Sequence, residues 1–210
     1  MMVYIYFKAS FGAFRSFKSV EMSPTAEFIT HSAAYGLLLG VAGIDRQDKQ
    51  KFVGAKIAIG MKRLPKVGRT YQQLIQGRRE LDGKKGGHFN LRPFWREVLV
   101  GLEGYIGLDH SELESLVRLG INQPSELRYW GLPFLGDNNF LVERIDAFDR
   151  PSACQWLCPL TGDETPNGGR LFYLTVWTDY QDSTGSKSLL FYLENADDAA
   201  PQKAWIPIQP

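Results

Sequence analysis

The chain has 210 residues, is 44% hydrophobic and 13% aromatic, and carries a formal net charge of +1 at pH 7. This composition excludes a wholly disordered polypeptide and fits one large domain, or one domain with an elaborate insertion. The near-neutral total hides a separation of charge. Residues 46–96 hold 14 of the 24 Lys and Arg with three acids, and residues 97–210 hold seven bases with 17 acids. A polyanion is the first candidate partner for such a basic segment.

The sequence features that report on location favour a reducing compartment. Residues 1–10 lack the basic region and cleavage site of a secretory signal, and the longest apolar run, 33–44, is shorter than the roughly 20 residues of a membrane span. Cys154 and Cys158 stand four apart with no His within 40 residues. We therefore expect two reduced cysteines in a loop, no metal, no cofactor and a cytoplasmic location.

The N-terminal residues predict a buried strand followed by a turn. Val3–Ala9 is β-branched and aromatic, which favours a central strand. In the turn at Phe11–Phe17, one cation, Arg15, lies among three aromatic residues. Two interpretations stay open: the aromatic residues pack against the core, or Arg15 meets a phosphate or lies on a base.

Thr30–Gly43 predicts a helix that Thr30 or Ser32 caps and Gly43 ends. Gly36 and Gly40 lie one turn apart on one face of this helix. Because glycine has no side chain, we expect this face to approach a sheet or a partner's backbone closely.

The basic segment begins as a strand at Lys56–Lys62 and then loses its alternation. Residues 63–94 are rich in Gly, Lys and Arg and include the run Gly83–Gly87. An irregular insertion of this length is usually functional, so we expect a mobile hairpin or arm. Its aromatic and His residues offer stacking faces for unpaired bases. The alternative is a solvated loop with surface lysines.

The next elements complete a repeating order of strands and helices. Trp95–Leu108 predicts a third strand, broken near Gly101 and Gly104. Ser111–Leu119 predicts a helix with a Ser111–Glu114 capping box, ended by Gly120. A loop at 122–139 leads to a fourth strand at Phe140–Phe148.

The order β-α-β-β-α-β indicates an α+β fold, a ferredoxin-like or RRM-like domain over residues 1–150 with a thumb insertion at 63–92. Residues 150–170 read as loop. Leu171–Thr178 and Ser188–Leu193 predict a β-hairpin, and residues 205–208 a short edge piece. Residues 151–210 are therefore a C-terminal hairpin extension packed on the same domain.

The sequence contains no phosphate-binding, dinucleotide-binding, zinc-protease or serine-hydrolase motif. Of the three histidines, His31, His88 and His110, His88 lies beside Lys84 and Lys85 and is the best candidate for a general base. A metal-independent endoribonuclease is therefore a second hypothesis.

Four stretches carry a resemblance to a known family. They are residues 13–15 after the first strand, the helix at 32–43 (Ser-x-x-x-Gly-Leu-Leu, ending in Gly), residues 95–100, and residues 122–133 with Asn-Gln-Pro and Tyr-Trp-Gly-Leu-Pro. Over roughly residues 3–140 the chain resembles the CRISPR-associated "Cas five" family of the RAMP superfamily, a subunit of type I Cascade surveillance complexes in antiviral defence. The C-terminal hairpin looks more like the type I-B or Dev-like branch.

The resemblance implies a ferredoxin-like domain with a β-hairpin thumb before the third strand. It also implies a non-catalytic subunit that binds the 5′ handle of the crRNA. Its partners would be the crRNA, the Cas seven filament, which it caps, and the large, Cas eight type subunit, with target DNA reached through the complex. One subfamily cleaves precursor RNA with a Tyr, Lys and His set, whose adjacent Lys-His pair has no counterpart here because two glycines separate Lys85 from His88.

Three hypotheses follow: an RNA-binding assembly subunit, an endoribonuclease that processes the repeat, and a protein-interaction module without RNA binding. The first is preferred. The residues expected to contact RNA are Phe14, Arg15, Tyr35, Lys62, Arg63, Lys66, Arg69, Tyr71, Arg78, Arg79, Lys84, Lys85, His88, Arg92 and Arg96.

Overall fold

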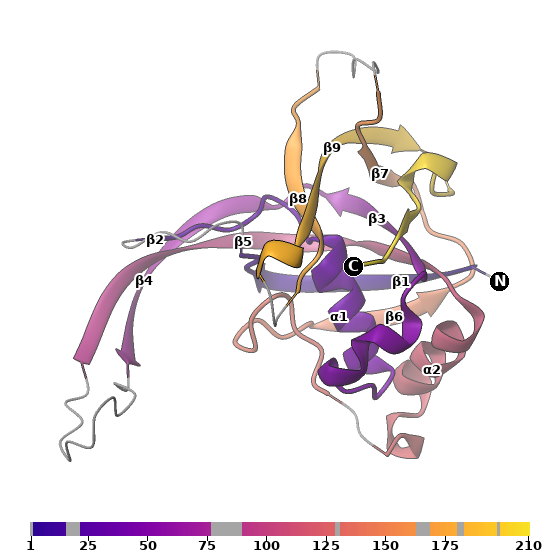
Figure 1. The fold of residues 1–210 in the computed structure, drawn as a ribbon, viewed down its shortest axis with the longest axis horizontal. Coiled ribbons are helices and arrows are strands. Elements are labelled where there is room, and N and C mark those ends of the chain that lie inside the picture. The colour runs from indigo at the N-terminus through magenta and orange to yellow at the C-terminus, as the bar shows by residue number, and fades with distance from the viewer. Residues whose placement is uncertain are drawn as a thin grey trace.

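A computed structural model of the chain describes residues 2–15, 22–76, 90–128, 131–162, 169–179, 183–196 and 198–210. Over these residues the fold is mixed, with one large sheet and few helices (Figure 1). Its elements are β1 (Met2–Gly12), β2 (Met22–Ser23), α1 (His31–Val41), β3 (Lys56–Arg63), β4 (Lys66–Gln76), β5 (Asn90–Asp109), α2 (Ser111–Asn122), β6 (Arg144–Phe148), β7 (Cys154–Pro159), β8 (Phe172–Trp177), β9 (Lys187–Ala196) and β10 (Ile206–Pro207). Short 3-10 turns occupy Arg46–Phe52, Pro124–Glu126, Ser183–Gly185 and Gln202–Ala204.

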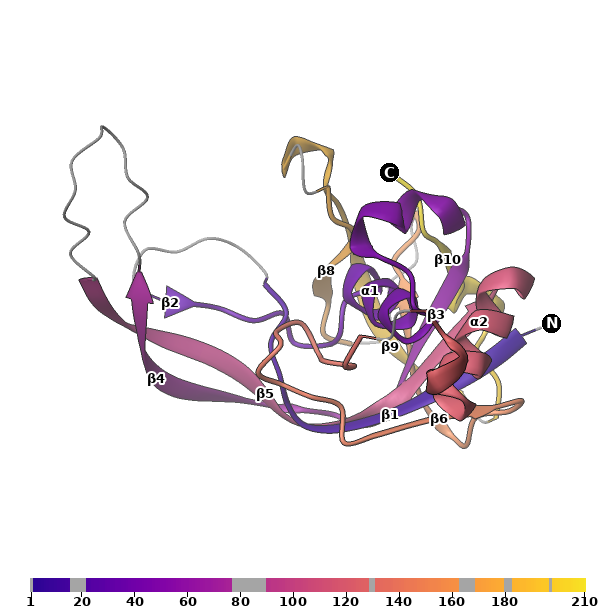
Figure 2. The same cartoon turned by 90° about the horizontal axis from the view of Figure 1, so that it is seen from below.

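The centre of the sheet is four antiparallel strands in the order β6-β1-β5-β3. As predicted, β1 is a central strand, paired with β5 on one side and β6 on the other. Alternate side chains of β1 point to opposite faces of the sheet and are buried in two different hydrophobic clusters. Val3, Ile5 and Phe7 are buried in the main core, and Tyr4 and Tyr6 belong to a smaller aromatic cluster with Trp156. Figure 2 shows α1 and α2 on the same side of these strands.

Helix α1 forms as the sequence predicts. The Oγ1 atom of Thr30 accepts a hydrogen bond from the backbone N–H of Ala33, and Gly43 follows the helix with a φ of 73°. No described part of the chain fills the space beside Gly36 and Gly40, because a Cβ built at either position meets no described atom within 4 Å, and the close approach of a partner's backbone stays a prediction.

Helix α2 differs from its prediction at both ends. His110 is the N-cap, and its Nδ1 accepts from the backbone N–H of Leu113. Glu114 therefore makes no capping box and instead accepts from Arg118 at 3.1 Å. The helix continues through Gly120, where a Cβ would lie 1.9 Å from the carbonyl oxygen of Val41. The close helix–helix contact is thus made by Gly120, which the sequence suggested as a stop.

The C-terminal strands extend the sheet from β3 in the order β7-β9-β8. The predicted loop at 150–170 is wrong over Cys154–Pro159, which forms β7, and both cysteines are buried. Burial raises the pKa of the Cys154 thiol to about 12, as expected of a structural cysteine. The predicted hairpin is confirmed as β8 and β9, and β10 pairs with β3.

The β8–β9 hairpin packs against the segment before α1 and against the first turn of that helix. The ring centroids of Phe28 and Phe172 are 4.7 Å apart in an edge-to-face contact, and those of His31 and Phe191 are 4.8 Å apart in a stack. The hydroxyl of Ser32 donates a hydrogen bond to the hydroxyl oxygen of Thr178.

The predicted domain division at residue 150 stays a prediction. None of the described helices has the length and apolar character needed to cross a membrane.

Candidate nucleic-acid interface

Strand β5 is 20 residues long and leaves the core sheet as one half of a ribbon. Strands β3 and β4 follow one another along it, with a register shift between Met61 and Arg63. The predicted break in β5 is wrong, because pairing continues on both sides of Gly101. The φ of Gly101 is 75°, which L side chains rarely adopt, and it marks the point where β5 changes partner from β3 to β4.

The predicted insertion is a hairpin over the residues that the structure describes. Strand β4 pairs with β5 in antiparallel register from Lys66 opposite Val100 to Gln76 opposite Asn90. We call residues 66–76 and 90–100 the ribbon. It extends well beyond the helices in both views (Figures 1 and 2). The short strand β2 pairs in parallel with β5 at Trp95 and Arg96 and covers that part of one edge, so the ribbon presents its two faces to a ligand.

An aromatic pair stands on one face of the ribbon. Tyr71 and Trp95 are directly opposite one another, and their ring centroids are 5.4 Å apart at an interplanar angle of 63°. The two side chains are 53% and 52% exposed. Large aromatic surface left open in this way is typical of a binding site, and sequence-tolerant base stacking is one established use of it.

A charged pair lies two residues nearer the core on the same face. Arg69 is opposite Glu97, with its Nη2 atom 3.4 Å from Oε1. Glu97 is largely covered, and its other oxygen accepts from the backbone N–H of Thr25, whereas Arg69 is mostly exposed. Because the Arg69 guanidinium is mostly exposed and forms a charge-assisted contact with only one carboxylate, its remaining N–H donors can reach a phosphate beside the ribbon.

The other face of the ribbon is fastened to the core through Arg96. Its Nη2 atom donates to Oδ2 of Asp137 at 2.7 Å, and its guanidinium lies 5.1 Å from the ring centroid of Phe140. Partial burial of Asp137 opposes ionisation, but hydrogen bonds from Asn139 and Arg96 outweigh it and lower the pKa of this carboxyl group. Arg96 was expected to bind RNA directly. In the folded chain its guanidinium pairs with Asp137 of the loop at 131–143, an arrangement suited to positioning the ribbon, and its contact with RNA stays a prediction.

The remaining described cations predicted to meet RNA surround the base of the ribbon. Arg15, Arg63 and Lys66 are exposed. Lys62 lies 3.6 Å from Glu103 and 5.8 Å from the ring centroid of Tyr6. Lys62 is therefore paired with a carboxylate, and Arg15, Arg63 and Lys66 are the exposed cations of this group.

Two predicted contact residues are buried in the core. Phe14 is 3% exposed, and its backbone N–H donates to Thr25. Tyr35 is also 3% exposed, and its hydroxyl donates to the carbonyl oxygen of Lys49 at 2.6 Å. Burial raises the pKa of Tyr35 to about 12. The aromatic faces of both residues are covered by protein, so their expected contact with RNA is corrected to a packing role.

Six predicted residues have no described side chain. Five of them lie outside the described residues: Arg78, Arg79, Lys84, Lys85 and His88. The sixth, Arg92, lies in β5, with its backbone opposite that of Leu74.

The sequence missed Trp95 as a binding candidate. The sequence pattern predicts Trp95 only as the first residue of a strand. The strand register of the ribbon places it opposite Tyr71, where both side chains are exposed. The signal available in the sequence was an aromatic residue between two cationic ones, Arg92 and Arg96, inside the basic segment.

The histidines within the described part of the chain do not form a reactive group. His31 is fully buried, and desolvation lowers its pKa to about 3. His110 caps α2 and meets the ring of Phe52 edge to face. No cluster of three His, Cys, Asp or Glu residues that could hold a metal ion occurs among the described residues.

Comparison with known proteins gives similarity in fold alone. No family model matches the sequence, and no curated protein matches it. One solved structure with a similar fold is named "CRISPR RNA-guided surveillance complex". The match has a TM-score of 0.58 and 10% identity, over 96% of this chain and 92% of that chain. Another, named "Crystal structure of Cas protein", has a TM-score of 0.53 and 13% identity over the whole of both chains.

Proposed function

We propose that this protein is a non-catalytic, RNA-binding subunit of a type I CRISPR Cascade surveillance complex, of the Cas five type. The observation that carries the proposal is the ribbon, whose one face presents Arg69 beside the exposed pair Tyr71 and Trp95. Cations that neutralise phosphates and aromatic rings that stack on bases are the two elements that single-stranded RNA requires.

The topology supports a ferredoxin-like core. The chain order β1-α1-β3-β5-α2-β6, the spatial order β6-β1-β5-β3 and the position of both helices on one face agree with the order expected of a split βαβ arrangement. RRM domains share this arrangement and use it to hold single-stranded RNA. The ribbon extends from the connection between the second and third core strands, where the family resemblance expects a thumb.

The similar folds support the place of this subunit in a complex. Both solved structures cover nearly the whole chain, ribbon and C-terminal strands included. In the proposed role the ribbon clamps the 5′ handle of the crRNA. Other surfaces cap the Cas seven filament and contact the large subunit, and target DNA is reached through the assembled complex.

The direct test is binding of a handle-containing guide RNA by the full chain, alone and with the filament subunit, across a range of salt. Charge reversal of Arg78, Arg79, Lys84 and Lys85 should weaken assembly on the RNA. Reversal of Arg128 and Arg150, which are exposed outside the ribbon, is the control of equal net charge for reversal of Arg78 and Arg79 alone. Unchanged assembly after reversal of the four cations between β4 and β5 would contradict the proposal.

The endoribonuclease hypothesis has its own assay. Incubation of the purified chain with a repeat RNA in EDTA should give no discrete cut if the subunit is non-catalytic. A discrete product that disappears in His88→Ala would assign catalysis to this chain instead. A protein-interaction module without RNA would behave differently again, because nuclease treatment of its complex would leave binding intact.

A further inference from the structure

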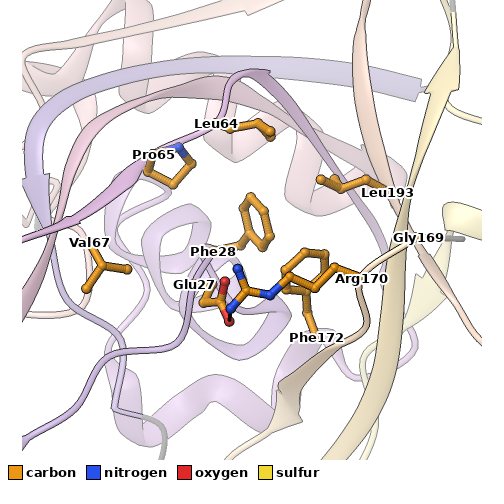
Figure 3. A pocket seen from close by; sticks show the side chains of 9 residues that line it. All are labelled: Glu27, Phe28, Leu64, Pro65, Val67, Gly169, Arg170, Phe172 and Leu193. Carbon is orange, nitrogen blue, oxygen red and sulfur yellow. Dashed lines mark hydrogen bonds and ion pairs between the residues drawn. The ribbon is translucent and has the colours of Figure 1, made fainter.

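An apolar pocket lies at the base of the ribbon. Its volume is about 310 Å³, and it opens between the β3–β4 connection, the segment before α1 and the start of β8. Figure 3 shows the ring of Phe28 near its centre, Leu64 and Pro65 on one wall, Val67 on another, and Phe172 and Leu193 opposite. No residue of this pocket was among the predicted RNA contacts.

The walls are apolar and partly open. Leu64 is 47% exposed and Val67 is 49% exposed, although both line a concavity that could cover them. Burying such surface on binding would be favourable, at about 25 cal/mol for each Å² of apolar area removed from water. The pocket therefore fits a flat or bulky apolar group of the size of one ring system.

The pocket also has charged groups at its edge. The Nη2 atom of Arg170 lies 2.8 Å from Oε1 of Glu27, and the guanidinium lies 5.7 Å from the ring centroid of Phe172. The Arg170 side chain is 72% exposed. A guanidinium donates to base carbonyl and ring nitrogen acceptors, and a carboxylate accepts from base amino groups. Such a pair can read the edge of a base whose rings are held between the apolar walls.

The pocket adjoins the ribbon at Val67, which lines the pocket and belongs to β4. Val67, Arg69 and Tyr71 are alternate residues of β4, so they share one face, and the distance from Val67 to Tyr71 is about 13 Å along the strand. Val67 is opposite Leu99, which is buried in the main core. A single strand that follows this face meets an aromatic pair, then a guanidinium, then the pocket.

We propose that the pocket holds one unstacked base of the RNA strand that lies along the ribbon. This inference rests on the proposed function and adds to it the position of a base-specific contact. An apolar side chain of a protein partner would also fit the walls. The base is favoured because the alternation of aromatic, cationic and apolar groups matches that of bases and phosphates, and because Arg170 and Glu27 can pair with a base edge.

The test uses the full chain and a guide RNA that carries a single abasic site at each position of its 5′ handle in turn. Loss of the base that enters the pocket should weaken binding about tenfold, as expected for one stacked base. The same scan is then run on Leu64→Ser and Val67→Ser, whose exposed side chains can be changed without opening the core. The penalty at that one position should largely disappear in both variants.

Leu132→Ser is the matched control, because Leu132 is an exposed leucine in a loop outside the pocket. It should keep the wild-type abasic profile. A profile in which every penalty persists in Leu64→Ser and Val67→Ser overturns the inference and leaves RNA binding by the ribbon in place. Wild-type protein that binds no guide RNA overturns both proposals.

Protein docking at the pocket has a distinct signature. In that case Leu64→Ser and Val67→Ser would weaken association with the purified filament or large subunit, and the abasic profile would match that of the wild type. That result overturns the assignment of a base to the pocket.

Discussion

Tyr71 and Trp95 face each other across the two strands of the ribbon, with ring centroids 5.4 Å apart and about half of each side chain exposed. Directly opposed aromatic residues stabilise a two-stranded ribbon by up to about 1 kcal/mol. This stabilisation of the ribbon does not account for the exposure of half of each ring to water. The exposure is accounted for if the two rings form a surface that a ligand covers when it binds.

Replacing either ring should weaken RNA binding more than it weakens the fold. We expect Tyr71→Ala and Trp95→Ala each to lower affinity for guide RNA by about tenfold, because one base loses its stacking partner. Filter binding or fluorescence anisotropy at fixed salt measures the change. Tyr173→Ala, which removes a more exposed ring on β8, is the control and should bind as the wild type does. Equal affinities for all three variants would contradict the stacking role.

The cations at the base of the ribbon should be visible in the dependence of binding on salt. Each phosphate contact to single-stranded nucleic acid contributes about 0.7 to the slope of log K against log salt. The double variant Arg63→Gln, Lys66→Gln should therefore have a slope smaller by about 1.4 if each side chain meets one phosphate. Arg128→Gln, Arg150→Gln removes the same charge elsewhere, and its slope should equal that of the wild type. A parallel reduction in both would indicate a general charge effect.

The sequence predicted the elements more reliably than the surfaces they present. Local pattern was sufficient for Val3–Ala9 as a central strand and for the capped helix after Thr30, because alternation and capping are properties of neighbouring residues. The hairpin in the basic segment was expected only as one form of an irregular, charged insertion, and its strand pairing could not be read from alternation. Strand β7 was missed because six residues between loops give little periodic signal, and its burial depends on pairing with β9.

The binding residues could be predicted only in part, because composition does not say which face a side chain occupies. Tyr35 and Trp95 are both aromatic residues near the expected RNA site. One is buried under the 3-10 turn, where its hydroxyl meets Lys49, and the other is exposed on the ribbon. Arg96 likewise belongs to the basic segment, but its partner, Asp137, is 41 residues away in the chain. Such pairings are set by the tertiary fold.

Arg96→Ala should lower stability and alter its dependence on acid. The bond to Asp137 is charge-assisted and mostly covered, so its loss should cost about 2 kcal/mol. The pKa of Asp137 is lower in the folded chain than its ordinary value of 3.8. The stabilisation is therefore complete above pH 3.8 and is lost as the pH falls through the lower, folded-state pKa. In Arg96→Ala this acid-dependent part should shrink, as urea unfolding at a series of pH values would show.

The same residue should also affect binding through the position of the ribbon. Arg96→Lys keeps the charge and loses the planar donor geometry, so it should bind guide RNA more weakly than the wild type if Arg96 positions the ribbon. A direct phosphate contact would instead be largely retained by lysine. Affinity at fixed salt separates these roles, because a positioning role lowers the affinity of Arg96→Lys, whereas a phosphate contact that lysine retains leaves both the affinity and the salt slope close to those of the wild type.

His31 should make the fold sensitive to mild acid. Its ring is fully buried against Phe191, neither ring nitrogen has a hydrogen-bond partner among the described residues, and its pKa is about 3 in the folded chain. The unfolded chain binds a proton near pH 6.5, so the folded state is fully stabilised above pH 6.5. That stability is lost as the pH falls from 6.5 towards 3, by up to about 1.4 kcal/mol per pH unit.

His31→Phe should remove this loss, because a phenyl ring can keep the stack on Phe191 and does not titrate. Between pH 7.5 and pH 5, the wild type should lose about 2 kcal/mol of unfolding free energy that the variant retains. Phe191→Leu is the control, since it disturbs the same contact but keeps the histidine, and its acid dependence should follow that of the wild type. If His31→Phe kept the wild-type slope in this range, another titrating group would have to account for it.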